Sequence, residues 1–412
     1  MPISKKQMQI MAFPYTKYDA IICDGAIRSG KTVFMTLSFV DDAMRRYNNQ
    51  RFGICGKTVD SAIKNIIDPY IALTYAKEKY SIQWRRSDKV LVVTSGDTQN
   101  VFEVFGGKDE SSYMLIQGRT LAGVLLDEVA LMPRSFVEQA AARCSVAGSR
   151  LWFNCNPGPP QHWFNQEWIM QAKDRNALHL HFLLEDNPSL SPEVVQRYKK
   201  LYSGVFYQRY ILGLWCVAEG LIYQQFAEDE KRYMISRENV PKLSYIEIGA
   251  DVGGNKSNHA YVATGYTATR DTMYVLKAWS YKATGVTVTE YRENLLKFAD
   301  EIREEYGFVD TIWPDCAEAA IVNELAAHSQ YRIRGCIKEE ILDRVRCADI
   351  LFSQDRIKIV EGQCDDLCDG LRTAVWDDKH DDRPLDDGSY DRDIIDAFDY
   401  SMTPHIAYLV RG

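Results

Sequence analysis

Apolar and polar positions along the first half of the chain follow two patterns. Short apolar runs between polar or glycine residues indicate buried strands, and apolar positions three and four apart indicate amphipathic helices. The patterns predict strands over residues 18–24, 52–55, 124–126 and 151–154, a helix over 32–47, and a hairpin of 90–94 and 101–105 that turns at 95–97. Strands that alternate with helices are typical of a parallel α/β sheet.

The second half has a different order of segments. In chain order, the pattern predicts a strand over 245–250, a hairpin of 259–266 and 272–279, an amphipathic helix over 285–306 and a strand over 309–313. Residues 188–210, between the two halves, are polar with helical spacing. Residues 377–393 are rich in Asp and contain Pro384 and Gly388, which indicates a flexible loop before a final helix.

Length and composition fit a globular protein with two domains. A chain of 412 residues exceeds the roughly 250–300 residues at which a single core stops growing. Its 46% hydrophobic and 26% charged residues are ordinary for such proteins. We place the domain boundary near Glu219 and Gly220. The expected domains are residues 1–219, with a helical lid or linker at about 186–219, and residues 220–412.

Charge and cysteine content exclude several classes of protein. No apolar run approaches the roughly 18 residues of a membrane span, and no apolar export signal begins the chain, so we expect a cytoplasmic protein. The ten scattered cysteines are then reduced thiols, and Cys364 and Cys368 lack the second pair that a zinc site needs. A net charge of −8 disfavours a static DNA-binding domain but allows a machine that grips DNA transiently.

A phosphate-binding motif follows the first predicted strand. Residues 25–32 match G-x-x-x-x-G-K-[ST] in full, between an apolar strand and a helix. In this motif backbone N–H groups surround the phosphates, Lys31 reaches the β- and γ-phosphates, and Thr32 ligates Mg²⁺. Arg28, inside the loop, is placed to stabilise charge on the γ-phosphate as a catalytic group. The predicted nucleotide-binding residues are Gly25, Arg28, Ser29, Gly30, Lys31 and Thr32.

Two carboxylates at the end of an apolar strand complete an ATPase signature. Asp127 at the strand tip is expected to hold Mg²⁺ beside the nucleotide, and Glu128 to orient and polarise the attacking water. Asn154 or Asn156, after another strand, would lie at the same sheet edge and sense the γ-phosphate. Arg119 is either a residue that reaches a neighbouring subunit's nucleotide or a surface ion-pair partner.

Together these residues resemble the large terminase family of tailed bacteriophages. The shared features are the loop G-x-x-R-S-G-K-T, the pair Asn156–Pro157, and the segments 182–190, 213–215 and 219–223. The resemblance implies an α/β chain with a P-loop ATPase domain of the additional-strand type followed by an RNase H-like nuclease domain. Gln7 or Gln9 is then the counterpart of the family's adenine-contacting glutamine.

The resemblance also implies partners and a place of work. An ATP-driven motor would translocate double-stranded DNA into a procapsid, with the nuclease cutting concatemeric DNA before and after filling. A small terminase subunit would deliver the DNA, and the chain would form a homo-oligomeric ring on the portal protein. This work would take place in the host cytoplasm, transiently on the procapsid and with no membrane involved.

Aspartates in the second half supply candidate ligands for a nuclease metal pair. Asp251 and Asp315 each end a predicted strand, and Asp393 and Asp396 share one face of the final helix. Carboxylates that converge from distant segments can hold two Mg²⁺ or Mn²⁺ ions, which clamp the attacking and leaving oxygens of a phosphodiester. By resemblance, Asp251, Asp315 and Asp396 match the family's three catalytic metal ligands. Relatives often carry His where this chain has Asp393, so Asp393 is either a fourth ligand or a change in metal preference.

Several residues and functions remain as alternatives. Glu318 and Lys338 either support the nuclease site or are ordinary surface charges. His179 and His181 would share one strand face but do not form a convincing metal set. A helicase or repair translocase would share the ATPase residues, but it needs a second RecA-like half, and none is visible after Gly220. The intact ATPase motifs disfavour a structural protein with a decayed nucleotide site.

Overall fold

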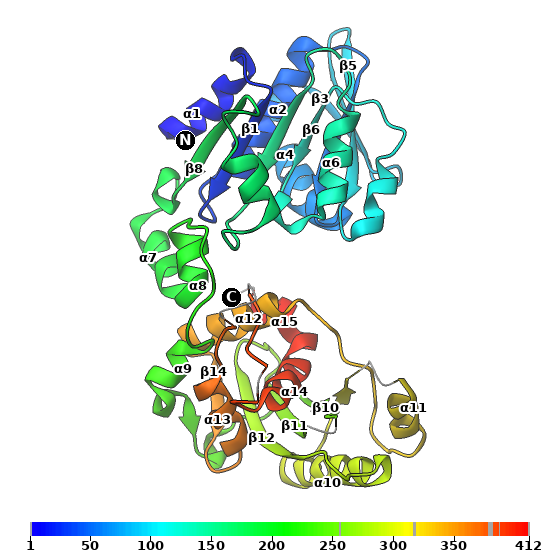
Figure 1. Ribbon diagram of the computed structural model, residues 1–412, viewed down its shortest axis with the longest axis vertical. Coiled ribbons are helices and arrows are strands. Elements are labelled where there is room, and N and C mark those ends of the chain that lie inside the picture. Colours follow the sequence, from blue (N-terminus) through cyan, green and yellow to red (C-terminus); the bar gives the residue numbers. More distant parts are fainter. Residues whose placement is uncertain (1, 255–256, 316–318, 378–381, 387, 411–412) are drawn as a thin grey trace. The chain divides into compact units, whose positions relative to one another are not determined.

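The computed structural model describes residues 2–254, 257–315, 319–377, 382–386 and 388–410, and the chain divides into two compact units (Figure 1). The first unit consists of Met1–Lys199 and Val205–Val217. The second consists of Lys200–Gly204 and Ala218–Gly412. Each unit is built around a β-sheet that helices cover, as the α/β prediction requires.

Within the described residues, the first unit holds an eight-stranded sheet in the order β3-β4-β5-β2-β6-β7-β1-β8. The strands from β5 to β8 in this order run parallel, and β4 and β3 extend the sheet as antiparallel strands. The strand β7 lies between β1, which leads into the phosphate-binding loop, and β6, which leads to Asp127. This inserted strand confirms the additional-strand type of P-loop fold. In chain order the strands are β1 (Ala20–Gly25), β2 (Arg51–Gly56), β3 (Ser81–Arg85), β4 (Val90–Ser95), β5 (Thr98–Gly106), β6 (Gly123–Leu126), β7 (Arg150–Asn154) and β8 (Ala177–Phe182).

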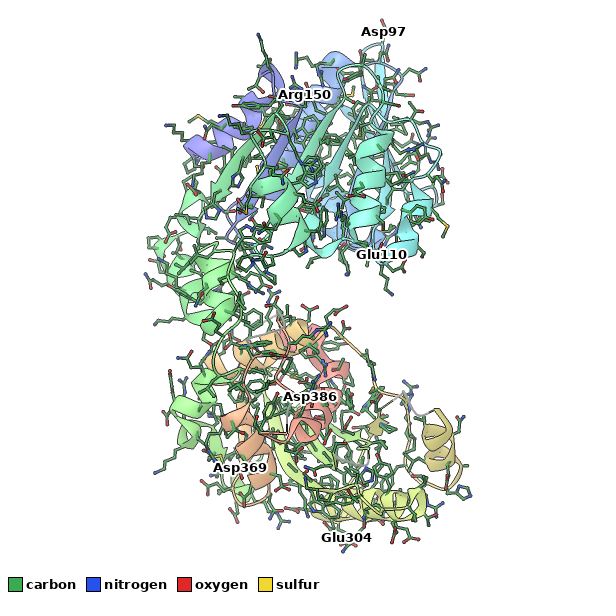
Figure 2. The ribbon with its side chains drawn as sticks, in the orientation of Figure 1. Asp97, Glu110, Arg150, Glu304, Asp369 and Asp386 are labelled. Atoms are coloured by element: carbon green, nitrogen blue, oxygen red, sulfur yellow. The ribbon has the colours of Figure 1, made fainter. Side chains whose placement is uncertain are left out.

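Helices bury both faces of the centre of this sheet, which is why strands such as β1 and β6 are buried along their whole length without alternation. Ile21 of β1 packs with Phe39 of α2 in one core, and the next residue, Ile22, packs with Phe136 of α6 in another. The helices up to residue 206 are α1 (Lys5–Ala12), α2 (Lys31–Arg46), α3 (Val59–Ala62), α4 (Asp68–Ala72), α5 (Thr74–Lys79), α6 (Arg134–Arg143), α7 (Pro192–Leu201) and α8 (Gly204–Phe206). The predicted hairpin is β4–β5, and Asp97 marks its tip (Figure 2).

The segment predicted to be helical over 188–210 is interrupted. Helix α7 ends at Leu201 and α8 begins at Gly204, and a π-helical turn, η7 (Tyr207–Ile211), follows. Between them, the backbone N–H and the hydroxyl of Ser203 both donate to Asp349, which lies in the same unit as Ser203. The Asp349 carboxylate accepts the hydrogen bonds that these donors would otherwise make to helical carbonyls. The helix is therefore broken at this point.

Within the described residues, the second unit holds a six-stranded sheet in the order β13-β10-β11-β12-β14-β9. The strands β10, β11 and β12 form an antiparallel meander, and β13 and β14 flank it as parallel neighbours. This is the RNase H-like sheet that the resemblance implies. The strands are β9 (Met234–Ile235), β10 (Tyr245–Asp251), β11 (Asn258–Tyr266), β12 (Met273–Lys282), β13 (Thr311–Pro314) and β14 (Ile357–Val360). The helices are α9 (Gln224–Glu228), α10 (Val288–Tyr306), α11 (Ala319–Ala327), α12 (Ile341–Ser353), α13 (Asp365–Thr373), α14 (Arg392–Met402) and α15 (Ile406–Leu409).

Helix α14 crosses the middle of this sheet and comes closest to β10 at Gly249 (Figure 1). A Cβ at Gly249 would lie 1.9 Å from the Ala397 carbonyl oxygen and 2.6 Å from the Ser401 nitrogen. Only glycine lets two backbones approach this closely. The contact therefore fixes the middle and last turn of α14 against β10.

Two negative findings concern the described residues. Their cysteines are all free thiols, as predicted. Their helices include none with both the length and the apolar character needed to cross a bilayer.

Replacing Gly249 tests the contact between α14 and β10. We expect Gly249→Ala to lower the free energy of unfolding of the second unit by roughly 1–3 kcal/mol, because the added methyl group forces the two backbones apart. Urea unfolding followed by circular dichroism measures the loss. Gly254→Ala is the control, since a Cβ there meets nothing within 4 Å. Equal stability of the two variants would contradict the role of Gly249.

Candidate functional site

The phosphate-binding loop joins β1 to α2 in a conformation that needs glycine at both ends. Gly25 has φ +115° and a Cβ there would lie 2.0 Å from the Phe182 carbonyl oxygen, and Gly30 has φ +86°. The loop is tied to two other segments, because Ala26 N–H donates to the Phe182 carbonyl at 2.8 Å and Ile27 N–H donates to the Tyr210 carbonyl at 2.9 Å. The carboxyl end of β8 and the η7 turn thus hold the loop in shape.

Lys31 is buried within the loop and bonds to backbone carbonyls. Its Nζ donates to the Ala26 carbonyl at 2.6 Å, to the Gly25 carbonyl at 3.1 Å and to Asn156 Oδ1 at 3.3 Å. Burial lowers the pKa of Lys31, and the nearby carboxylate of Asp127 opposes this shift. An ammonium group held by neutral carbonyls can exchange them for phosphate oxygens, which bind it more strongly.

Asp127 and Thr32 lie side by side at the sheet edge. Thr32 Oγ1 donates to Asp127 Oδ1 at 3.2 Å, and Asn154 Nδ2 donates both to Thr32 Oγ1 at 2.8 Å and to Asp127 Oδ1. Asn65 Nδ2 donates to Asp127 Oδ2 at 3.3 Å. Burial raises the pKa of Asp127 although all three hydrogen bonds oppose it. A hydroxyl and a carboxylate oxygen together suit Mg²⁺, which prefers hard oxygen ligands.

The remaining predicted ATPase residues lie around this pair. Glu128 follows Asp127 with φ +57°, a strained backbone conformation for a residue with a side chain, and its side chain is partly exposed. Arg28 is exposed, and its guanidinium lies 6.0 Å from the ring centre of Tyr198. Arg119 pairs with Glu103 at 3.3 Å within the chain. This contact is the one that the ion-pair alternative for Arg119 predicts, and the alternative contact with a neighbouring subunit stays a prediction.

Sequence reasoning missed a polar cluster under the loop, centred on Asp24. The buried Asp24 carboxylate has His179 Nε2 at 2.7 Å and His181 Nδ1 at 3.1 Å from Oδ1, and it accepts from Trp215 Nε1 at 2.8 Å. Burial alone would raise the pKa of Asp24, but the hydrogen bonds from both histidines lower it well below its usual value. The sequence signal for this cluster was the spacing of His179 and His181, two residues apart on one strand. In the structure both histidines bond the buried carboxylate of Asp24.

Of the two candidate glutamines, Gln7 lies against the loop. It is buried, its Nε2 donates to the Ser29 carbonyl at 3.2 Å, and its side chain closes a capping box with Ser4 at the start of α1. A Cβ on Gly30 would lie 2.6 Å from Gln7 Nε2. Gln7 therefore supports the loop directly from α1.

In the second unit, two of the predicted carboxylates leave neighbouring strands at one edge. Asp251 is the last residue of β10 and Asp315 follows β13. These strands are parallel with Ala250 opposite Pro314, and Asp315 N–H donates to the Ala250 carbonyl at 3.0 Å. Parallel pairing in this register brings both carboxylates to the same edge of the sheet.

The other two carboxylates come from the start of α14. Asp391 caps this helix by accepting from Ile394 N–H at 3.3 Å, and Asp393 and Asp396 follow within its first two turns. Asp393 accepts from Asn258 N–H and shares a hydrogen bond with Asp251. The start of β11 and the first turn of α14 are thereby joined at the site.

Crowding of these carboxylates has an electrostatic consequence at Asp251. Burial, followed by repulsion from Asp396, Asp393 and Asp315, raises the pKa of Asp251 to about 8. Burial is the largest cause of this shift, and the added repulsion means that the charges of the three aspartates lie near Asp251. A site with a surplus of clustered negative charge suits divalent cations.

Lysine and arginine side chains neutralise part of the negative charge of these aspartates. Lys338 Nζ lies 2.7 Å from Asp315 Oδ1, and Asp396 has Arg344 Nη1 at 3.1 Å and Arg392 Nε at 3.6 Å. In the described part of the chain no three His, Cys, Asp or Glu side chains are arranged to enclose a metal ion. The candidate Glu318 lies outside the described residues.

Comparisons with known proteins agree with this geometry. The family described as "Terminase large subunit, T4likevirus-type, N-terminal" matches residues 22–229. The large terminase from a thermophilic bacteriophage is similar with a TM-score of 0.85 and 37% identity over 98% of this chain and 99% of that one. A structure of that terminase in complex with ADP has a TM-score of 0.82 and 34% identity over the whole of both chains. Curated protein sequences gave no match.

The raised pKa of Asp251 makes stability depend on pH. Folded Asp251 keeps its proton up to about pH 8, whereas the ordinary pKa is 3.8, so the folded state loses stability as pH rises between these values. Asp251→Asn removes this loss. We expect the variant to be more stable than wild type at pH 8 in EDTA, and the difference to shrink as pH falls towards about 4.

Urea unfolding in EDTA across this pH range measures the difference. Asp369→Asn, at the surface of α13 (Figure 2), is the control and should follow the wild type. A difference between Asp251→Asn and wild type that is equal at pH 5 and pH 8 would show that carboxylate crowding does not act on Asp251.

Proposed function

The chain belongs to the large terminase family and is thus an ATPase and DNA endonuclease of phage DNA packaging. On this premise we propose which residues carry out each activity. Residues 1–219 form the ATPase domain and residues 220–412 the nuclease domain. ATP hydrolysis in the first drives double-stranded DNA into a procapsid, and the second cuts concatemeric DNA. The pairing of Thr32 with Asp127 through Asn154 is the observation that best supports the first assignment.

In the ATPase site we propose that the loop binds the triphosphate of ATP. Lys31 exchanges the Ala26 and Gly25 carbonyls for the β- and γ-phosphate oxygens, and Gly30 begins the helix whose N–H groups face the phosphates. Thr32 and Asp127 would hold Mg²⁺, which supplies charge neutralisation at the phosphates. Ser29 and Gly25 shape the loop.

Hydrolysis also needs an oriented water molecule and a group that stabilises the negative charge on the γ-phosphate. Glu128, next to Asp127 at the sheet edge, accepts a proton from the attacking water and orients it. Arg28 is exposed in the loop and is free of intramolecular ion pairs among those described, so it can turn to the γ-phosphate. Asn156, which contacts Lys31, is placed to respond when the γ-phosphate leaves.

In the nuclease site we propose that Asp251, Asp315 and Asp396 hold two Mg²⁺ or Mn²⁺ ions, with Asp393 as a further ligand. The metal pair would polarise a phosphodiester of the DNA and activate water. The support is the convergence of four carboxylates from β10, β13 and α14, since burial and then repulsion from the other three raise the pKa of Asp251 to about 8. Divalent cations relieve this repulsion more fully than Lys338 and Arg344 do.

The proposed partners follow from the family. Double-stranded DNA is gripped through its phosphates, without regard to sequence. A small terminase subunit delivers the DNA, and copies of the chain form a ring on the portal protein in the host cytoplasm. A net charge of −8 means that the phosphate contacts come from a local basic strip. The helicase alternative lacks support, because the sheet of the second unit is a mixed one built on an antiparallel meander.

Glu128→Ala tests the ATPase proposal. We expect kcat for ATP hydrolysis to fall by about 10²–10⁴-fold, because the attacking water loses its base, while the Kd for ATP changes little. Phosphate release and fluorescent-nucleotide titration measure the two quantities. Glu138→Ala on α6 is the control, a carboxylate that pairs with Arg134 at the surface. Normal turnover by Glu128→Ala refutes the assigned role.

Asp315→Asn tests the nuclease proposal. We expect cleavage of circular and linear plasmid DNA with Mg²⁺ or Mn²⁺ to fall by about 10²-fold or more, while ATP hydrolysis is retained. The loss of one carboxylate removes a metal ligand without changing the size of the side chain. Asp369→Asn should cut at the wild-type rate. Undiminished cutting by Asp315→Asn would remove Asp315 from the site.

A further inference from the structure

Arg344 of α12 connects the nuclease carboxylates to a second, deeper carboxylate. Its side chain is 9% exposed, and a single nitrogen, Nη1, lies 3.1 Å from Asp396 Oδ1 and 2.9 Å from Asp399 Oδ2. Asp396 and Asp399 are one turn apart on the same face of α14. Arg344 thus lies between two carboxylates of one helix, of which only Asp396 is a proposed metal ligand.

This cluster is poorly suited to stabilising the fold. Burying a guanidinium and a carboxylate costs several kcal/mol for each ion, and the cost is recovered only when the remaining hydrogen bonds are made. Among the described residues, Arg344 Nε and Asp399 Oδ1 are buried without a hydrogen-bond partner, as is Tyr223 Oη. All three residues line one small cavity beside Asp396. Apolar residues of similar volume would fill this place at least as well, so the charges point to a functional role.

The geometry also limits what that role is. A side chain 9% exposed, with both ion pairs directed at α14, does not reach a DNA phosphate at the surface. Its effect must therefore pass through Asp396. Arg344 engages Oδ1 of that carboxylate, whereas Arg392 Nε lies 3.6 Å from Oδ2, beyond hydrogen-bond distance. Oδ1 of Asp396 is therefore held at hydrogen-bond distance, whereas Oδ2 has only the longer ion pair with Arg392, which a metal ion can replace.

We propose that Arg344 is a positioning residue of the nuclease: anchored by Asp399, it fixes the Asp396 carboxylate so that Oδ2 faces the metal site. This inference rests on the proposed role of Asp396 as a metal ligand. Partners that orient metal-binding side chains typically change metal affinity or activity by about 10–100-fold when they are removed. The effect should therefore appear in the metal dependence of cleavage.

Arg344→Gln tests the proposal in the full-length protein. We expect the Mn²⁺ concentration for half-maximal plasmid cleavage to rise by about tenfold and the maximal rate to fall, because Asp396 loses its fixed orientation. Arg344→Lys should recover part of the metal dependence, since one nitrogen makes both ion pairs and an ammonium can replace it. ATP hydrolysis and thermal unfolding, measured in parallel, report on integrity.

Arg372→Gln is the matched control. Arg372 also bridges two carboxylates of the same unit, Glu230 at 2.8 Å and Asp369 at 2.6 Å, and neither is a proposed metal ligand. We expect its cleavage and metal dependence to equal those of the wild type. A rise in the metal requirement equal to that of Arg344→Gln would overturn the proposal, because any lost ion pair would then have the same effect.

Other outcomes distinguish a failure of the positioning role of Arg344 from a failure of the proposed nuclease site. If Asp396→Asn abolishes cleavage while Arg344→Gln keeps the wild-type metal dependence, the positioning role alone is wrong. If Asp396→Asn cleaves normally, the proposed nuclease site itself is wrong. Should Arg344→Gln fail to fold, Asp399→Asn keeps the side-chain shape but weakens the anchor. It should then raise the half-saturating Mn²⁺ concentration by about threefold or more, and no change would overturn the proposal.

Discussion

The register of parallel strands decides where polar side chains gather in both units. Backbone hydrogen bonds align β1 with β7 at Cys23 and Asn154, and β6 with β7 at Leu126 and Phe153, so the loop after β1, Asn154 and Asp127 all leave the sheet at one edge. The same constraint aligns β10 with β13 in the second unit. Because the backbone supplies the alignment, the side chains at these edges need not bind one another, and they remain available to ligands.

Gathering like charges at a sheet edge costs free energy, and apolar packing elsewhere in the unit must offset it. Ile248 and Ala250 of β10 are buried in the core that α10 covers, only one residue before the crowded Asp251. Gly249, on the other face, admits α14 to backbone contact and so places Asp393 and Asp396. The strand that brings the carboxylates together is therefore held on both faces, which lets the cluster persist despite its repulsion.

The sequence predicted elements that carry their own local signal. An apolar run before a complete P-loop gives β1 and α2. Helix α10 was predicted from its periodicity over 285–306 and begins three residues later, at Val288, where Thr287 and Glu290 form a capping box. The strands β9 and β14 were missed; β9 has only two residues, too few to show a period. Asp24 and Arg344 were missed for another reason, since their partners lie over fifty residues away and only tertiary packing reveals them.

Two of the proposed metal-binding aspartates, Asp127 and Asp396, are held by bonds of different strength. Asp127 accepts from the neutral groups of Thr32, Asn154 and Asn65, and its pKa stays raised because burial outweighs them. Asp396 is held by the full charge of Arg344. Hydrogen bonds to either carboxylate are charge-assisted, but the Arg344 guanidinium adds the Coulomb attraction of a second full charge. An ATPase carboxylate that must exchange partners in every cycle is thus held by bonds that are easily given up, whereas the nuclease carboxylate is held in a fixed orientation.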